Sequence, residues 1–294
     1  MKANRIPGLL NVIETSDVNE IRAVNERPEI DRQFSSRLPL LNGLLLSNLL
    51  ATLSDRGKRF PTMQPRPSAS RAHDQKTLWD QLSAKASSFR EGPLELESVA
   101  VWLKGIGEDQ EVGILLQELV GRAFELSYKA SEESWAAAVT MADAIRTKNP
   151  LKLLGWKISG RIRSARNTLA AKVAGDRAAI HGTGIAIHNL VAALKAMKAL
   201  YNDIGLRESL SPAGATYRSL AAPATVLRQA TAAGSICGCP FKRGTLFVLK
   251  LSEAFKRSGD DGMVFQRKTW SQCPAEQWVP ALLEGIWVRA TNRR

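Results

Sequence analysis

Apolar residues recur three and four positions apart through most of the chain from residue 74 to residue 201. This spacing is typical of helices that bury one face. It predicts four successive helices, at residues 74–89, 94–106, 114–128 and 131–146, the last with Ser131 as its N-cap. A further helix begins at Asp176 or Thr183 and ends at Tyr201. The pattern therefore predicts a mainly α-helical protein.

A short strand followed by a helix is predicted at the beginning of the chain. Residues 9–13 are mostly apolar and favour a strand. The helix after it has Ser16 or Asp17 as its N-cap, with Glu20 placed as a capping-box partner.

A β-hairpin is predicted near residues 235–251. Gly238 and Gly244 bound a turn, and the run at 245–251 is β-branched and apolar, as in a strand. The fold class is therefore predicted as mainly α with a few short β-strands.

Two stretches are predicted to be irregular. Residues 56–70 combine prolines with basic side chains and form a loop or linker, and residues 205–214 are also loop-like.

A chain of 294 residues with 44% hydrophobic content allows one large domain or two ordinary ones. We expect a single domain over residues 1–294.

The most apolar stretch, residues 38–53, is rich in leucine and interrupted by asparagine and glycine. It is shorter than the roughly 20 residues that span a bilayer. We expect a core helix here, with contact to a membrane surface as the alternative.

The chain carries a net charge of +13, which attracts acidic partners such as nucleic acid, anionic lipid or an acidic redox protein. Much of this charge lies at residues 146–172, where basic and apolar residues alternate as in an amphipathic helix, or in two helices broken near Gly155 or Gly160. This segment is either a solvated helical face or a docking surface.

Three cysteines in a long chain argue against a disulfide framework and for a reducing compartment, and the N-terminal residues lack the apolar run of a signal peptide. We therefore expect a cytoplasmic protein.

The pair Cys237 and Cys239 is too closely spaced for a usual zinc site and has no second ligand pair. The sequence contains no phosphate-binding loop, nucleophile elbow or dinucleotide fingerprint.

The order of motifs in residues 215–287 carries more information than composition does. Arg218, Pro223 and Arg228 are followed by the hairpin motif at 238–245 and then by Cys273 before a helix-like run. This order resembles the C-terminal third of the cytochromes P-450, the haem-thiolate monooxygenases. The resemblance implies a shortened P-450-like helical fold.

The chain departs from the family pattern at two motifs. The glutamate of the family's Glu-x-x-Arg motif is Ala215 here, so a buried Arg218 would lack its carboxylate. In the segment that corresponds to the haem loop, Phe265 is one residue too far from Cys273, and the loop glycines are absent.

The resemblance implies haem as cofactor and assigns its contacts. Cys273 would be the iron ligand, because a thiolate at a helix N-terminus is stabilised there. Arg228, Arg218 and His73 would bind the propionates.

The family's oxygen-activating helix carries a glycine, an acid and a threonine, and it is matched most nearly by residues 178–189, where Gly182 and Thr183 match and the acid is missing. Thr183 would face the distal pocket, with His181 and His188 as proton carriers. These two histidines lie seven residues apart and share a helix face. They could flank a substrate or haem, or could be ordinary core histidines.

The resemblance predicts an iron-binding oxidoreductase of the monooxygenase type, which acts on a small hydrophobic molecule and takes electrons from an acidic ferredoxin-like donor. A degenerate member with another role, such as an isomerase or dehydratase, is also consistent with the missing residues. The alternative is a non-catalytic basic helical module that binds an acidic protein, nucleic acid or an anionic membrane surface.

Overall fold

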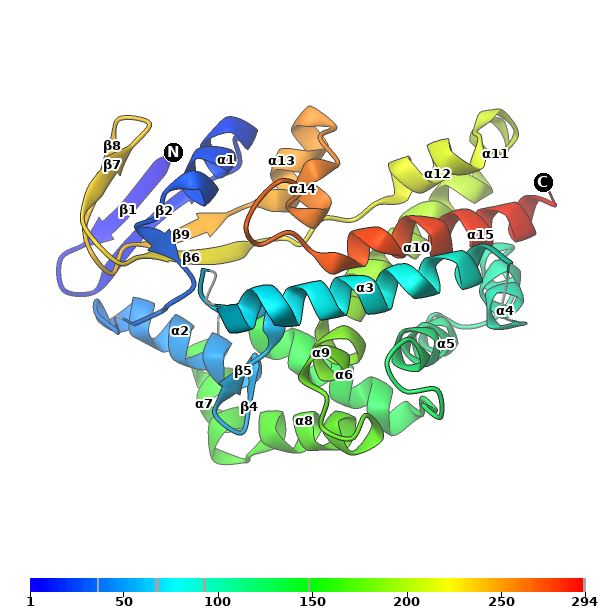
Figure 1. Cartoon of the computed structure of the whole chain (residues 1–294), viewed down its shortest axis with the longest axis horizontal. Helices are drawn as coiled ribbons and strands as arrows, with labels where there is room; N and C mark the ends of the chain where they lie inside the picture. The colour runs from blue at the N-terminus through cyan, green and yellow to red at the C-terminus, as the bar shows by residue number, and fades with distance from the viewer. Residues whose placement is uncertain (36, 67–68, 92–93, 148, 293–294) are drawn as a thin grey trace. The chain divides into compact units, whose positions relative to one another are not determined.

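The computed structural model of the chain describes residues 1–35, 37–66, 69–91, 94–147 and 149–292 (Figure 1). The chain forms two compact units, each built from two separate stretches of sequence. Unit 1 comprises Met1–Asp74 and Ala222–Cys273, and unit 2 comprises Gln75–Ala221 and Pro274–Arg294. In the described part of the chain, no helix has the length and apolar character needed to span a bilayer.

Unit 1 contains a five-stranded sheet with the strand order β1, β2, β9, β6, β3. The bounds of these strands are, in that order, Lys2–Ile6, Leu10–Thr15, Leu246–Leu249, Val226–Ala230 and Ile30–Asp31. β2 and β9 are parallel, and the other neighbouring pairs are antiparallel. β9 is central, which explains its unbroken apolar sequence, Leu-Phe-Val-Leu.

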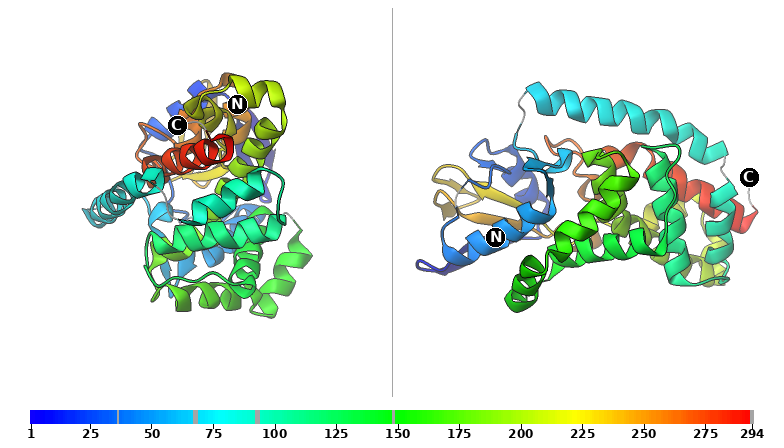
Figure 2. Two further views of the ribbon diagram at one scale, coloured as in Figure 1. Left: turned by 90° about the vertical axis from the view of Figure 1, so that its right-hand side faces the viewer. Right: turned by 90° about the horizontal axis from the view of Figure 1, so that it is seen from below.

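The helices α1 (Val18–Glu26), α2 (Leu40–Thr52), α13 (Leu251–Ser258) and α14 (Gly262–Phe265) also belong to unit 1. Figures 1 and 2 show α1 and α13 on one side of the sheet and α2 on the other. α1 begins at the predicted cap, because Asp17 accepts a hydrogen bond from the amide of Glu20 at 3.0 Å. The strand β1 was not predicted, since its residues are mostly polar and exposed.

The predicted hairpin forms, but with a different second strand. β7 (Gly234–Ile236) pairs with β8 (Cys239–Phe241), and Cys237 and Gly238 take positive φ values of 47° and 73° at the turn. Two positive φ values in succession are characteristic of the tight turns that join twisted strands. The apolar run after Gly244 is β9, which joins the five-stranded sheet instead.

The stretch at residues 56–70 is more regular than the loop that was predicted. β4 (Ser54–Asp55) and β5 (Lys58–Arg59) form a second small hairpin, the 3₁₀ turn η1 (Pro61–Met63) follows, and α3 begins at Ala69. Pro61 is the first residue of η1, a position where proline is compatible with a helical turn.

Unit 2 consists of helices. In chain order they are α3 (Ala69–Glu91, of which the first residues belong to unit 1), α4 (Leu94–Leu103), α5 (Asp109–Arg122), α6 (Glu132–Arg146), α7 (Pro150–Ile158), α8 (Arg161–Lys172), α9 (Arg177–His181), the π-helical turn η2 (Gly182–Ala186), α10 (Ile187–Asn202), α11 (Ile204–Ser209), α12 (Pro212–Ser219), the 3₁₀ turn η3 (Pro274–Gln277) and α15 (Val279–Thr291). α15 packs against α4 and α12, and α10 packs against α5 and α12. The predicted class, mainly helical with a few short strands, is confirmed.

The basic segment at residues 146–172 contains two helices, as one of the two alternatives predicted. Gly160 separates α7 from α8 and has a φ of 67°, a left-handed conformation that glycine adopts without strain. Gly155 lies inside α7 and does not break it.

The prediction of a loop at residues 205–214 is wrong. α11 and α12 occupy most of it, and each begins at a side-chain cap. Asp203 accepts from the amide of Leu206 at 3.0 Å, and Ser211 accepts from the amide of Gly214 at 3.1 Å. Short capped helices show little hydrophobic periodicity, so the caps were the signal that periodicity missed.

Candidate functional site

The loop that leads to Cys273 is closed by its own backbone. The amide of Cys273 donates to the carbonyl of Phe265 at 2.7 Å, and the amide of Thr269 donates to the carbonyl of Gln266 at 3.2 Å. Gln266 and Lys268 have φ values of 52° and 61°. Non-glycine residues rarely adopt this left-handed conformation. The loop thus makes tight turns without the glycines that the family pattern would place there.

Arginine side chains gather around the ring of Trp270, close to Cys273 in the sequence. Measured from the guanidinium carbon to the ring centroid, the distances are 5.3 Å for Arg32, 5.1 Å for Arg66, 4.8 Å for Arg71 and 5.0 Å for Arg228. All of them lie within cation–π range. We call these four side chains the arginine cluster.

Arg228, on β6, is the fully buried member of the cluster. Its Nη2 donates to Asn25 Oδ1 at 3.2 Å, Gln266 Oε1 at 2.7 Å and Ser271 Oγ at 2.8 Å, and its Nη1 donates to the carbonyl of Leu227 at 2.9 Å. Its Nε is buried and has no hydrogen-bond partner. Among the described residues, the acceptors bonded to this cation are all neutral, and its Nε is left without a partner.

Burial lowers the pKa of Arg228 well below its ordinary value, and the neighbouring Arg32 and Arg71 lower it further. Burial likewise lowers the pKa of Arg32 to about 9, with Arg71 acting in the same direction. Arginine keeps its proton in folded proteins, so both guanidinium groups are cations here. The cluster is thus a set of cations held together against their mutual repulsion.

Asp31, on β3, is the carboxylate that opposes the whole cluster, and its charge raises the pKa of each member. Its Oδ1 accepts the backbone amides of Arg32 at 2.6 Å and of Arg66 at 2.7 Å. Glu29, which acts on Arg66 more weakly than Asp31 does, already forms an ion pair with Arg27 at 2.9 Å. Positive charge therefore exceeds negative charge among the described residues of the cluster.

The guanidinium groups at the other cluster positions donate largely to backbone carbonyls. Arg66 donates to the carbonyl of Arg27 at 2.7 Å, and Arg71 donates to the carbonyls of Pro65 at 3.0 Å and Trp270 at 3.3 Å. Carbonyl oxygens solvate a cation without cancelling its charge. An anion that entered this site would therefore gain electrostatic stabilisation from several arginines at once.

Cys273 is partly exposed and lies directly before η3 in the sequence. Its side chain interacts electrostatically with Arg32. A neighbouring cation favours the thiolate over the thiol. The structure thus brings the predicted iron ligand and the arginine cluster together in unit 1.

The three residues predicted to bind propionates lie in different environments. Arg228 belongs to the cluster, whereas His73 is exposed on α3, where Arg71 points into the cluster instead. Arg218 is exposed on α12 of unit 2. Because Arg218 is not buried, the absence of a glutamate at Ala215 leaves no unpaired internal charge.

Three cluster members, Arg32, Arg66 and Arg71, were not predicted as site residues. Arg66 and Arg71 stand in or beside the basic stretch at 56–70, which was read as a loop. The high density of arginine in this stretch could have indicated an anion site. Only the fold shows that these arginines meet at the ring of Trp270.

Thr183 is completely buried in unit 2, in the turn η2. Its hydroxyl donates to the carbonyl of Ala179 at 2.7 Å, and its carbonyl accepts from Gln117 Nε2 at 3.0 Å. Gln117 also binds Ser134, which donates its hydroxyl to Gln117 Oε1 at 2.7 Å. Burial raises the pKa of Tyr128, whose hydroxyl is buried near those of Ser134 and Thr183 and has no hydrogen-bond partner among the described residues. The polar groups around Thr183 thus bind one another across α5, α6 and η2.

His188 stacks on Trp135 of α6, with ring centroids 5.2 Å apart. Burial lowers its pKa, and a hydrogen bond with the backbone of Ala138 opposes that shift. His181 lies at the end of α9 and is half-buried. The π-helical turn η2 between the two histidines changes the register that seven residues of regular helix would give.

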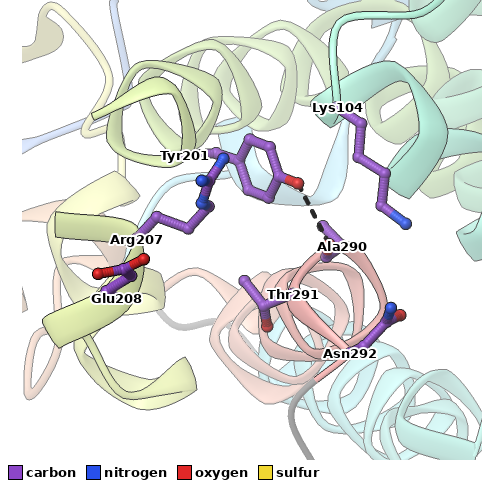
Figure 3. Close-up of a pocket in the computed structure, with 7 residues that line it drawn as sticks. All are labelled: Lys104, Tyr201, Arg207, Glu208, Ala290, Thr291 and Asn292. Carbon is purple, nitrogen blue, oxygen red and sulfur yellow. Dashed lines mark hydrogen bonds between the residues drawn. The ribbon is translucent and has the colours of Figure 1, made fainter. Parts of the chain in front are cut away.

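A surface pocket of about 410 Å³ lies in unit 2 (Figure 3). It is lined by Lys104, Tyr201, Arg207, Glu208, Ala290, Thr291 and Asn292. The hydroxyl of Tyr201 points to the carbonyl of Ala290 at 3.4 Å, and the guanidinium of Arg207 lies 5.0 Å from the Tyr201 ring. None of the predicted site residues is among the residues that line it.

No family model and no curated protein matches this sequence. Solved structures, however, match over nearly its whole length. One is a variant of cytochrome P-450 OleT in complex with arachidonic acid, with a TM-score of 0.64 and 11% sequence identity, covering 95% of this chain and 80% of that one.

Two further matches agree. CYP175A1 from Thermus thermophilus has a TM-score of 0.57 and 16% identity, with 97% of this chain and 82% of that one covered. Cytochrome P-450 BioI, solved in complex with an acyl carrier protein that carries a fatty acid, has a TM-score of 0.56 and 14% identity, with 98% and 86% covered. At such low identity these matches show the fold alone, and the predicted P-450-like fold is confirmed.

Proposed function

On the premise that the chain has the fold of the cytochromes P-450, we propose that it is a haem-thiolate oxidoreductase that acts on a small hydrophobic molecule. The observation that carries the proposal is the arginine cluster beside the partly exposed Cys273. A buried excess of cations is costly for a protein unless an anion compensates it. The two carboxylates of haem are such anions.

The residues present fit this cofactor. Arg228 Nε and Trp270 Nε1 are buried and have no hydrogen-bond partner, so donors remain for an anionic group. Cys273 is accessible enough to bind a metal, and the charge of Arg32 favours its thiolate. Cys273 would be the iron ligand, and Arg228, Arg32 and Arg71 would hold the propionates.

When bound, haem supplies the one-electron and oxygen chemistry of the reaction. The protein supplies position and charge. Gln266 and Ser271 hold the guanidinium of Arg228 in one orientation, because both accept from the same Nη2. The hydrogen bond between the Cys273 amide and Phe265 holds the loop that presents the sulfur. These contacts preorganise the site before a ligand arrives.

The other predicted roles belong to the same proposal. Thr183, His181 and His188 would serve proton transfer, with His73 and Arg218 as further propionate contacts. Thr183 and His188 already have partners within unit 2, so a catalytic role requires them to act from those positions. An acidic ferredoxin-like protein would suit the net charge of +13 as electron donor.

The substrate is proposed to be a small hydrophobic molecule. The OleT variant among the matches was solved with arachidonic acid, and the BioI protein with a fatty acid on its carrier protein. Because the family's acid–threonine pair lacks its acid here, a haem-dependent isomerisation or dehydration fits the proposal as well as oxygen insertion does.

The absorption spectrum of the purified protein tests the proposal. With haem bound, the ferrous–carbon monoxide complex should show the shifted Soret band that thiolate ligation produces. Cys273→Ala should abolish that shift, whereas Cys239→Ala, the matched control, should leave it unchanged. A protein that fails to bind haem under reconstitution, or a C273A variant with an unaltered band, would refute the proposal.

A second candidate function is supported by the surface of α7 and α8. Lys152, Arg161 and Arg163 are exposed there, and the apolar side chains of Leu151 and Ile158 are 77% and 79% exposed. Exposed cations on short helices suit a polyanion such as nucleic acid. In that case, binding to nucleic acid should weaken steeply with salt, and Arg161→Gln with Arg163→Gln should reduce both affinity and salt dependence.

A further inference from the structure

The helix α2 of unit 1 has leucines on both of its sides: Leu46 and Leu49 are buried, and several others are exposed. Asn42 and Gly43 are buried, whereas Leu40, Leu44 and Leu45 are 58%, 53% and 40% exposed. An amphipathic helix usually turns its apolar side chains towards the core, so the exposed leucines are the unusual feature of α2. The segment was predicted as a core helix, and only part of it is one.

The outward position of the leucines is fixed by specific contacts. Asn42 Nδ2 donates to the carbonyl of Asn11 at 2.8 Å and to the carbonyl of Gly244 at 3.3 Å, and Asn42 Oδ1 accepts from the Asn11 amide at 3.3 Å. At Gly43 a Cβ atom would lie 2.1 Å from the carbonyl oxygen of Arg37. Rotating the helix to bury its leucines would therefore break these bonds and force a clash.

The apolar surface continues onto the turn between β1 and β2. The amide of Leu41 donates to the carbonyl of Leu9 at 3.0 Å, which places the start of α2 on this turn. Ile6 is 49% exposed and Leu9 is 36% exposed. We call the exposed apolar side chains of the turn and of α2 the leucine face; they are Ile6, Leu9, Leu38, Leu40, Leu41, Leu44 and Leu45.

The charges on these two segments are all positive. Arg5 and Arg37 are exposed and directly precede Ile6 and Leu38 of the leucine face in the sequence, and they donate to the carbonyls of Pro240 and Phe34. Neither residues 1–13 nor residues 32–53 contain an aspartate or a glutamate. A patch of this composition is unusual on a soluble surface, where contiguous apolar area is normally small and acids and bases are mixed.

From this arrangement we propose that the leucine face docks on the surface of an anionic lipid bilayer. The leucines would enter the boundary between head groups and acyl chains, and Arg5 and Arg37 would bind lipid phosphates. The surface is formed by one side of a helix and a hairpin turn, which suits a bilayer better than it suits a peptide ligand. The proposal does not depend on haem.

A second copy of the chain is a less suitable occupant. In a two-fold interface the same patch meets itself, so Arg5 and Arg37 of one copy would approach those of the other without any acid between them. Lipid head groups supply the opposite charge that a second copy lacks.

Flotation of the full chain with vesicles tests the proposal. The protein should float with vesicles of phosphatidylcholine that contain phosphatidylglycerol, and weakly or not at all with phosphatidylcholine alone. Replacing Leu40, Leu44 and Leu45 together by glutamine should reduce the partitioning of the protein onto vesicles about tenfold or more. Each substitution removes the favourable free energy of transferring an apolar side chain from water into the bilayer. Arg5→Gln with Arg37→Gln should reduce binding to the anionic vesicles only.

The matched control replaces an equal number of exposed apolar residues on α7, namely Leu151, Leu154 and Ile158, by glutamine. This variant should float like the original protein. Equal loss in both triple variants, loss only in the α7 variant, or no binding by the original protein would each overturn the proposal. Circular dichroism and thermal unfolding check that the α2 variant is folded. Because the three replaced leucines are exposed, the free energy of unfolding of this variant should not fall.

Discussion

In unit 2, Gln117, Ser134 and Thr183 are buried and bind one another through hydrogen bonds of 2.7–3.0 Å. In unit 1, Arg228 is buried equally deeply, yet within the described part of the chain its hydrogen-bond acceptors are all neutral and its Nε has no partner. The first group needs nothing from outside the protein. The second carries a charge that the protein itself does not cancel.

The difference teaches where to look for a ligand in a fold of this kind. Satisfied polar groups in a close-packed interior hold helices in register. A cluster of like charges is retained when a ligand of opposite charge compensates it. By this criterion, the arginine cluster of the sheet unit is the place where we propose that an anionic cofactor binds, and the polar groups around Thr183 hold helices of unit 2 together.

The largest effect on stability is expected at Trp270, because its ring contacts all four side chains of the arginine cluster. Trp270→Leu removes the ring that the arginine cluster contacts, whereas Trp270→Phe keeps an aromatic face. With about 0.5–1 kcal/mol for each cation, the free energy of unfolding should be about 2–4 kcal/mol lower for the leucine variant than for the phenylalanine variant. Urea unfolding of both variants measures the difference.

Trp102 in unit 2 is the control for that measurement, since Lys198 Nζ lies 4.0 Å from its ring centroid. The same pair of substitutions there should differ by about 0.5–1 kcal/mol from cation–π attraction. A difference at Trp270 no larger than the one at Trp102 would mean that the cluster gains nothing from the ring.

A smaller effect tests how closely unit 2 is packed. At Gly121 a Cβ atom would lie 2.2 Å from the ring of Tyr128, so Gly121→Ala should lower the free energy of unfolding by about 1–3 kcal/mol. Gly155 lies in α7 with no heavy atom near its Cβ position, so Gly155→Ala should raise stability by up to about 1 kcal/mol. If Gly121→Ala proved neutral, the interior around α5 would be looser than the structure indicates.

Anion binding tests whether the arginine cluster of unit 1 carries positive charge that the protein leaves uncompensated. Without haem, the protein should be stabilised by a small multivalent anion such as pyrophosphate, by about 1 kcal/mol, because the anion binds only the folded cluster. Thermal unfolding at constant ionic strength measures this. Arg228→Gln should reduce the stabilisation, and Lys195→Gln, at an exposed ion pair with Asp109, should not. Equal stabilisation of both variants would place the anion elsewhere.

The smallest effect concerns pH. Burial lowers the pKa of His188 below its ordinary value of 6.5, so the unfolded chain binds the proton more readily than the folded protein does. Stability should therefore be fully present above pH 6.5 and should decline as the pH falls through 6.5 towards the lowered pKa. His188→Phe keeps a ring against Trp135 and should remove this part of the pH dependence. An unchanged slope in urea unfolding would show that other groups cause it.

Much of the helical structure could be predicted from the sequence, since its signals are local. Asp17 and Ser131 cap their helices as expected, and the break at Gly160 was one of two predicted positions. The helices at 205–214 were missed because they are short, and periodicity needs several turns to become visible.

For the candidate site, motif order proposed Cys273 and Arg228 but did not indicate the arginines that gather around Trp270. His73 was predicted to contact the cofactor, whereas Arg71, two residues earlier on the same helix, is the one that lies over Trp270. A helix turns by more than half a circle over two residues, so a shift of that size exchanges the buried side for the exposed side.

The amino-acid sequence by itself determined the helix caps, the turns, the mainly helical class and the presence of one cysteine before a helical segment. These features depend on residues a few positions apart. Only the tertiary structure decided which arginines meet at Trp270 and which side of α2 faces outward. Both depend on contacts between residues about 200 positions apart, such as Arg71 with Trp270 and Asn42 with Gly244. No local pattern encodes such contacts, because they form only when the sheet brings distant segments together.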